Sequence, residues 1–129
     1  MGSIILKGEP KSTQHIYRNT CRGGFASTYM TAEGKGIKEA YQWEAKSQWK
    51  QPVINTPVAI HVHFYFETKC RRDLDNRNKL VLDALTGIVY VDDSQIDELH
   101  LYRHYDKAKP RIEVLISLLG AQRADRFND

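Results

Sequence analysis

Two short acidic segments hold the residues of this chain that are best suited to metal-dependent chemistry. Asp73 and Asp75 lie two positions apart, and Asp92-Asp93 follows later in the sequence. In a helix, residues two apart diverge by about 200°, whereas in an extended or turn segment they project to the same side. We therefore expect Asp73 and Asp75 to precede a helix that starts near Asn76. A third carboxylate could come from Asp92 or Asp93, at the other end of that helix.

Converging carboxylates of this kind predict phosphodiester hydrolysis. Hard Mg²⁺ prefers carboxylate oxygens and retained waters, and Mn²⁺ can take its place. Such ions can generate hydroxide and stabilise the leaving 3′ oxygen. Lys79, in the first turns of the expected helix, could reach the scissile phosphate.

Each of these residues also has a structural interpretation. Asp75 could be a helix N-cap, and Lys79 could pair with Asp75 or Asp83 at i,i+4. Asp92-Asp93 could form a turn at a strand end. Singly, these interpretations are the commoner ones, but the combination within one short segment favours the metal site.

The charge distribution supports a protein that binds a polyanion. The formal net charge is +3. Residues 1–72 carry 11 Lys and Arg against 5 Asp and Glu, whereas residues 73–98 carry 2 against 7. A basic chain with one acidic block suits a metal-dependent nuclease, because the basic part attracts DNA and the acidic part holds the ion. The alternative is chance clustering of surface charge.

The elements that must position these residues form one α/β domain over residues 1–129. Alternation predicts strands at 3–7, 58–66, 96–105 and 111–118, and residues 106–110 would form a hairpin turn between the last two. Helices are expected from Thr31, a plausible N-cap, to about Trp49, and from about Asn76 to Leu85. The order β-α-β-α-β-β predicts a mixed sheet with two helices packed on one face. Residues 120–129 look like a polar tail.

Residues 8–30 show no sustained periodicity and read as a long, mobile loop. The loop carries interleaved basic and aromatic residues: Lys11, Tyr17, Arg18, Arg22, Phe25 and Tyr29. This mixture suits phosphate contact and base stacking, although a solvated loop with scattered charges would look the same.

Histidine and cysteine give weaker signals. His61 and His63 share one strand face, and His100 and His104 share another, but zinc-ligand spacing is absent, so a structural or interface role is favoured. The two cysteines form no pair, and no signal peptide or long apolar run occurs, which favours a reduced, cytoplasmic protein without a membrane span.

The whole pattern resembles a known family. The run Arg71-Arg72-Asp73-Leu74-Asp75-Asn76, then Lys79, Asp83-Ala84-Leu85 and Asp92-Asp93-Ser94-Gln95, closely resembles the RusA family of phage-derived Holliday-junction resolvases. The resemblance implies that Asp73, Asp75, Asp93 and Lys79 are functional and ranks Asp93 above Asp92, although Asp92 could assist at the metal.

The resemblance also implies a homodimer, Mg²⁺ and symmetrical nicking of four-way DNA in recombination and repair, with a prophage as a typical source. Two opposed nicks need two related sites, and a twofold dimer would supply them. Arg71, Arg72 and Arg77 would hold the DNA backbone together with the basic loop residues.

Two other functions stay open. A branched-DNA-binding protein that no longer cuts would share the fold and the charge pattern. A phosphodiesterase for small nucleotides would not need Lys11, Arg18 and Arg22.

Overall fold

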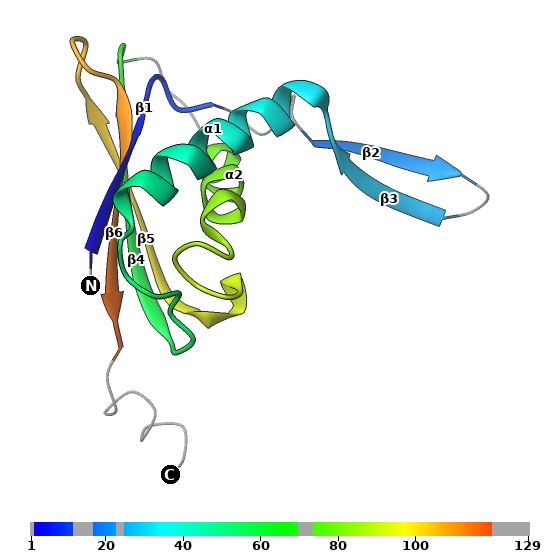
Figure 1. Cartoon of the computed structure of the whole chain (residues 1–129). Helices are drawn as coiled ribbons and strands as arrows, with labels where there is room; N and C mark the ends of the chain where they lie inside the picture. The colour runs from blue at the N-terminus through cyan, green and yellow to red at the C-terminus, as the bar shows by residue number, and fades with distance from the viewer. Residues whose placement is uncertain (1, 12–16, 23–24, 70–73, 120–129) are drawn as a thin grey trace.

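The computed structural model describes residues 2–11, 17–22, 25–69 and 74–119, with the backbone alone for residues 17–22, 25–29, 75 and 76 (Figure 1). The strands are β1 (Gly2–Lys7), β2 (Tyr17–Arg22), β3 (Phe25–Met30), β4 (Val58–Phe66), β5 (Ile96–Tyr105) and β6 (Arg111–Leu118). The helices are α1 (Ala32–Gln48), α2 (Asp75–Leu85) and the short 3₁₀ helix η1 (Asp93–Gln95). None of the described helices is long and apolar enough to cross a bilayer.

A four-stranded mixed sheet in the order β1-β6-β4-β5 forms the body of the protein, and both long helices cover one of its faces (Figure 1). This architecture confirms the predicted α/β order. Alternate residues of β4 are fully buried beneath the helices: Val58, Ile60, Val62, Phe64 and Phe66. Strands β1 and β6 add Ile4, Leu6, Ile112, Val114 and Ile116 to the same core. The period of two in the sequence therefore identified the buried face correctly.

Helix α1 follows the predicted limits closely. Thr31 is its N-cap, and the Thr31 hydroxyl accepts a hydrogen bond from the Gly34 amide (3.3 Å). Near its other end, Gln48 fastens the helix to β1: the Ile5 amide donates to Gln48 Oε1, and Gln48 Nε2 donates to the Ile5 carbonyl, both at 2.7 Å. Edge strand β1 is thus held by a helix side chain on one side and by antiparallel β6 on the other.

The predicted hairpin between the last two strands is wrong. Strand β5 pairs only with β4, in parallel, and β6 lies on the opposite side of β4, in antiparallel register. Residues 106–110 therefore carry the chain across the end of β4, where the Asp106 amide donates to the Phe66 carbonyl (2.8 Å). Two alternating strands with a short connection resemble a hairpin in sequence, but the more apolar β6 takes the internal position between β1 and β4, and β5 lies at the edge of the sheet.

The expectation of an unstructured loop at 8–30 also needs correction. Strands β2 and β3 pair antiparallel from Tyr17↔Met30 to Arg22↔Phe25 and form a separate two-stranded sheet that extends away from the body (Figure 1). The Gly23-Gly24 dipeptide between them is a recognised hairpin signal. The contribution of this segment to DNA binding stays a prediction.

Candidate functional site

Of the first acidic segment, the structure describes only the Asp75 backbone, which lies at the start of α2. The helix begins at Asp75, one residue earlier than expected, with Leu74 as the preceding cap residue. The Asp75 backbone thus belongs to the first helical turn and not to the segment before it. Asp73, Arg71, Arg72 and the Asp75 side chain lie outside the described residues.

Two basic residues follow within the first turns of α2. Lys79 is exposed and lies four positions after Asp75, so it shares that side of the helix. Arg77 is half-buried, and its guanidinium carbon lies 5.4 Å from the centroid of the Phe66 ring, at the end of β4. Packing against an aromatic ring limits the motion of this cation and keeps it beside the start of α2.

The second acidic segment precedes β5 and is held by a local hydrogen-bond network. The Ser94 hydroxyl donates to Asp92 Oδ2, and this bond is the main reason that the pKa of Asp92 lies below its usual value. Asp93 is exposed, and its carboxylate forms no hydrogen bond or ion pair with the described residues. The two neighbouring carboxylates therefore differ: Asp92 is engaged in local structure, whereas Asp93 is free to bind a ligand.

Gln95 anchors this segment to the rest of the protein. The Asp92 amide donates to Gln95 Oε1 (2.9 Å), and Gln95 Nε2 donates to the carbonyls of Ile54 (2.8 Å) and Thr56 (3.0 Å). The sequence analysis assigned no role to Gln95. The signal was the Asp92-x-x-Gln95 spacing, which is typical of a capping box.

Tyr90, two residues before Asp92, connects the same segment to α2. Its hydroxyl donates to the Leu82 carbonyl in α2 (2.6 Å), and its ring is fully buried. Burial raises the pKa of Tyr90 well above its usual value, so the hydroxyl stays protonated and keeps this bond. Asp92 and Asp93 are thereby held close to the C-terminal part of α2.

The start of α2 and the second acidic segment consequently lie at opposite ends of one β4-α2-β5 unit. The parallel register runs from Val58↔Ile96 to Phe66↔Tyr105, so α2 must run back along the sheet between the end of β4 and the start of β5. Its 11 residues span about 16 Å. Among the described residues, no three His, Cys, Asp or Glu side chains are grouped closely enough to hold a metal ion.

The predicted DNA contacts are distributed over several elements. Lys11 is exposed just after β1, and its backbone bonds the buried Tyr41 hydroxyl. Arg18 and Arg22 belong to β2, where only their backbone is described. Arg77 and Lys79 both belong to α2, whereas Lys11 belongs to the segment that follows β1.

A mixed sheet covered on one face by two helices, with the exposed Asp92 and Asp93 just before β5, defines a small α/β protein. The family model described as endodeoxyribonuclease RusA matches residues 7–117, and the chain belongs to this family of endodeoxyribonucleases. The chain is 27% identical over 119 residues to the crossover junction endodeoxyribonuclease RusA of Escherichia coli strain K12, covering 92% of this chain and 95% of that protein. It is 29% identical over 112 residues to the protein of the same name from Enterobacteria phage 82, covering 86% and 90%.

Proposed function

We propose that this protein is a Mg²⁺-dependent, structure-selective endonuclease that resolves four-way DNA junctions by paired symmetrical nicks. The observation that carries the proposal is the family match, which includes both acidic segments. Its relatives are named crossover junction endodeoxyribonucleases, a name that fits a role in recombination and repair of DNA in the cytoplasm.

The proposed metal ligands are Asp73, Asp75 and Asp93, with Asp92 nearby. Carboxylate oxygens are the donors that Mg²⁺ prefers, and the exposed Asp93, whose carboxylate has no partner in the described part of the chain, fits this requirement. When bound, Mg²⁺ or Mn²⁺ would activate water and stabilise the leaving oxygen. Lys79 would place a positive charge beside the phosphate as negative charge develops on its oxygens.

The geometry of α2 supports a homodimer. One copy holds the start of α2 and Asp93 at opposite ends of the helix, so a single chain does not group them. In a twofold pair, Asp73 and Asp75 of one copy could meet Asp93 of the partner subunit.

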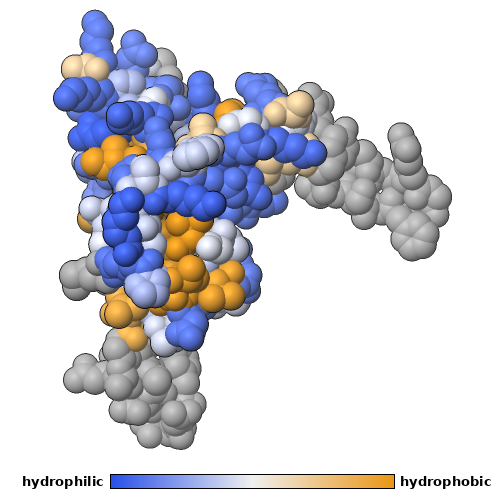
Figure 2. All heavy atoms as spheres, viewed as in Figure 1, coloured by the Kyte–Doolittle hydropathy of each residue, from blue (hydrophilic) through white to orange (hydrophobic). Residues whose placement is uncertain are grey.

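The surface beside Asp92 also suits contact with a second copy. Val91 is 57% exposed and Val53 is 43% exposed, and Ile54 beside them is half-buried. Figure 2 shows apolar surface gathered below α1, where α2 and the segment leading to β5 lie. Burying such a patch between two copies would remove apolar area from water.

The proposed DNA-binding residues are Lys11, Arg18, Arg22, Arg71, Arg72 and Arg77. They would contact backbone phosphates, which position the duplex arms without reading sequence. Affinity should therefore fall steeply with salt concentration.

The test is cleavage of a synthetic four-way junction by the wild type, Asp93→Asn and Asp92→Asn, with Mg²⁺, with Mn²⁺ and with chelator. We expect metal-dependent paired nicks by the wild type, loss of cleavage in Asp93→Asn, and a smaller defect in Asp92→Asn, whose carboxylate mainly orders η1. Binding without cleavage in both metals would refute the enzyme proposal and favour a non-catalytic branched-DNA-binding protein.

A further inference from the structure

The open face of the sheet, opposite the helices, carries a continuous stack of six rings. The rings alternate between β4 and β5 in the order Tyr65, His104, His63, Tyr102, His61 and His100. Successive centroids are 4.5, 5.0, 4.3, 5.9 and 4.4 Å apart, and the planes are inclined by 8–21°. The stack contains four of the five histidines of the chain.

The parallel register creates this stack. His61 lies opposite His100, His63 opposite Tyr102, and Tyr65 opposite His104, so all six side chains project from the same face. Neighbouring strands are about 4.8 Å apart, which is close to the stacking distance of flat rings. Ring edges meet as well as ring faces, because His61 Nδ1 lies 3.0 Å from the Tyr102 hydroxyl.

Charged side chains contact the terminal ring at each end of the stack. The Arg111 guanidinium carbon lies 3.8 Å from the centroid of the Tyr65 ring, and Arg111 also pairs with Asp106 at 2.7 Å. At the other end, His100 Nε2 lies 3.5 Å from Glu98 Oε1. These contacts hold the two ends of the stack in place.

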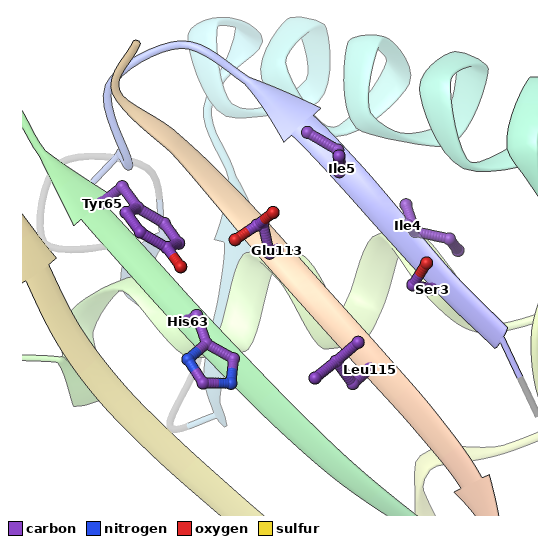
Figure 3. A pocket seen from close by; sticks show the side chains of 7 residues that line it. All are labelled: Ser3, Ile4, Ile5, His63, Tyr65, Glu113 and Leu115. Atoms are coloured by element: carbon purple, nitrogen blue, oxygen red, sulfur yellow. The ribbon is translucent and has the colours of Figure 1, made fainter. Parts of the chain in front are cut away.

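The middle holds two facing imidazole nitrogens, His63 Nδ1 and His104 Nε2, 2.8 Å apart. Two metal–nitrogen bonds of about 2.0–2.1 Å that meet at a right angle span about 2.9 Å. Glu113 on β6 is the register partner of His63, and its carboxylate lines the same shallow hollow as His63 and Tyr65 (Figure 3). The nitrogen spacing and the nearby negative charge both suit a divalent cation.

We infer that His63 and His104 form a two-histidine chelate for a borderline transition-metal ion of the Ni²⁺ or Cu²⁺ class. Since no third His, Cys, Asp or Glu among the described residues is placed to complete a metal site with these two, water would fill the remaining positions. In the metal-free pair, one nitrogen donates its hydrogen to the other. On binding, that proton moves to the outer nitrogen of the same ring, and both facing lone pairs are given to the metal. Mg²⁺ would not compete, because it prefers oxygen ligands.

The experiment measures Ni²⁺ binding by equilibrium dialysis at pH 7.5, with protein that carries no polyhistidine tag. His63→Phe and His104→Phe remove the facing nitrogens but keep a ring in the stack, and His100→Phe is the matched control. We expect one more Ni²⁺ per chain for the wild type and the control than for the other two variants. Equal binding by all four proteins, or none by the wild type, would overturn the inference.

A thermal readout separates chelation from folding. A ligand that binds only the folded state raises the unfolding midpoint, so Ni²⁺ should raise the midpoint of the wild type and of His100→Phe, but not that of His104→Phe. Circular dichroism without metal checks that all the variants fold. Ni²⁺ shifts of the same size in folded wild type and His104→Phe would contradict the site. Mg²⁺-dependent junction cleavage by His104→Phe should be unchanged. Failure of the two-histidine chelate can therefore be distinguished from failure of the proposed endonuclease function.

Discussion

Replacing Gln95 by alanine tests whether anchoring the second acidic segment matters for catalysis. The substitution removes three hydrogen bonds, one from the Asp92 amide and two to the carbonyls of Ile54 and Thr56. At about 0.5–1.5 kcal/mol each, and near the lower end where the partners are exposed, the loss amounts to about 1.5–3 kcal/mol. A domain with about 5–15 kcal/mol of stability would remain folded.

Gln48→Ala is the matched control, because Gln48 also makes three hydrogen bonds to backbone groups, two with Ile5 and one with Glu44. Ile5 lies in β1, at the opposite edge of the sheet from β5. Urea unfolding should show similar destabilisation in both variants. Junction cleavage at saturating Mg²⁺ should fall about 10- to 100-fold in Gln95→Ala only, since a misplacement near 1 Å is that costly. Equal cleavage rates in the two variants would refute the idea that Gln95 positions Asp93.

Three further perturbations test the site, the core and the open face. Asp75→Asn should abolish cleavage but preserve or tighten junction binding in gel-shift assays, because it removes a ligand and a negative charge; loss of the folded circular dichroism spectrum would instead indicate a structural role. Phe64→Ala should lower the free energy of unfolding by about 3–5 kcal/mol, whereas Trp43→Ala, at a side chain that is 75% exposed, should change it by less than about 0.5 kcal/mol. Burial, followed by the charge of His104, lowers the pKa of His63 in the folded state, so the unfolded state binds more protons near pH 6.5. Stability should therefore fall as the pH drops from about 7 through 6.5, and His63→Phe should flatten this part of the urea-midpoint profile; an unchanged slope would contradict this assignment.

Local patterns in the sequence predicted the main strands and both long helices. The alternation of 58–66 gave β4 and its buried face, and Thr31 gave the start of α1. Both signals act within a few residues, through the pleat of a strand and through a side-chain cap, so they can be read without knowledge of the fold. The acidic segments carried the family resemblance because residue types and spacings within a short run can also be read without knowledge of the fold.

Only the tertiary structure decided which strands are neighbours and what their side chains meet. Alternation shows which face of a strand is buried but does not identify the neighbouring strand, so the position of β6 on the far side of β4 could not be predicted from this pattern. The parallel pairing of β4 with β5 then merged two separate histidine pairs into one stack. The same pairing set Asp93 and the start of α2 at opposite ends of a helix, because a right-handed β-α-β connection must return along the sheet before the second strand can begin.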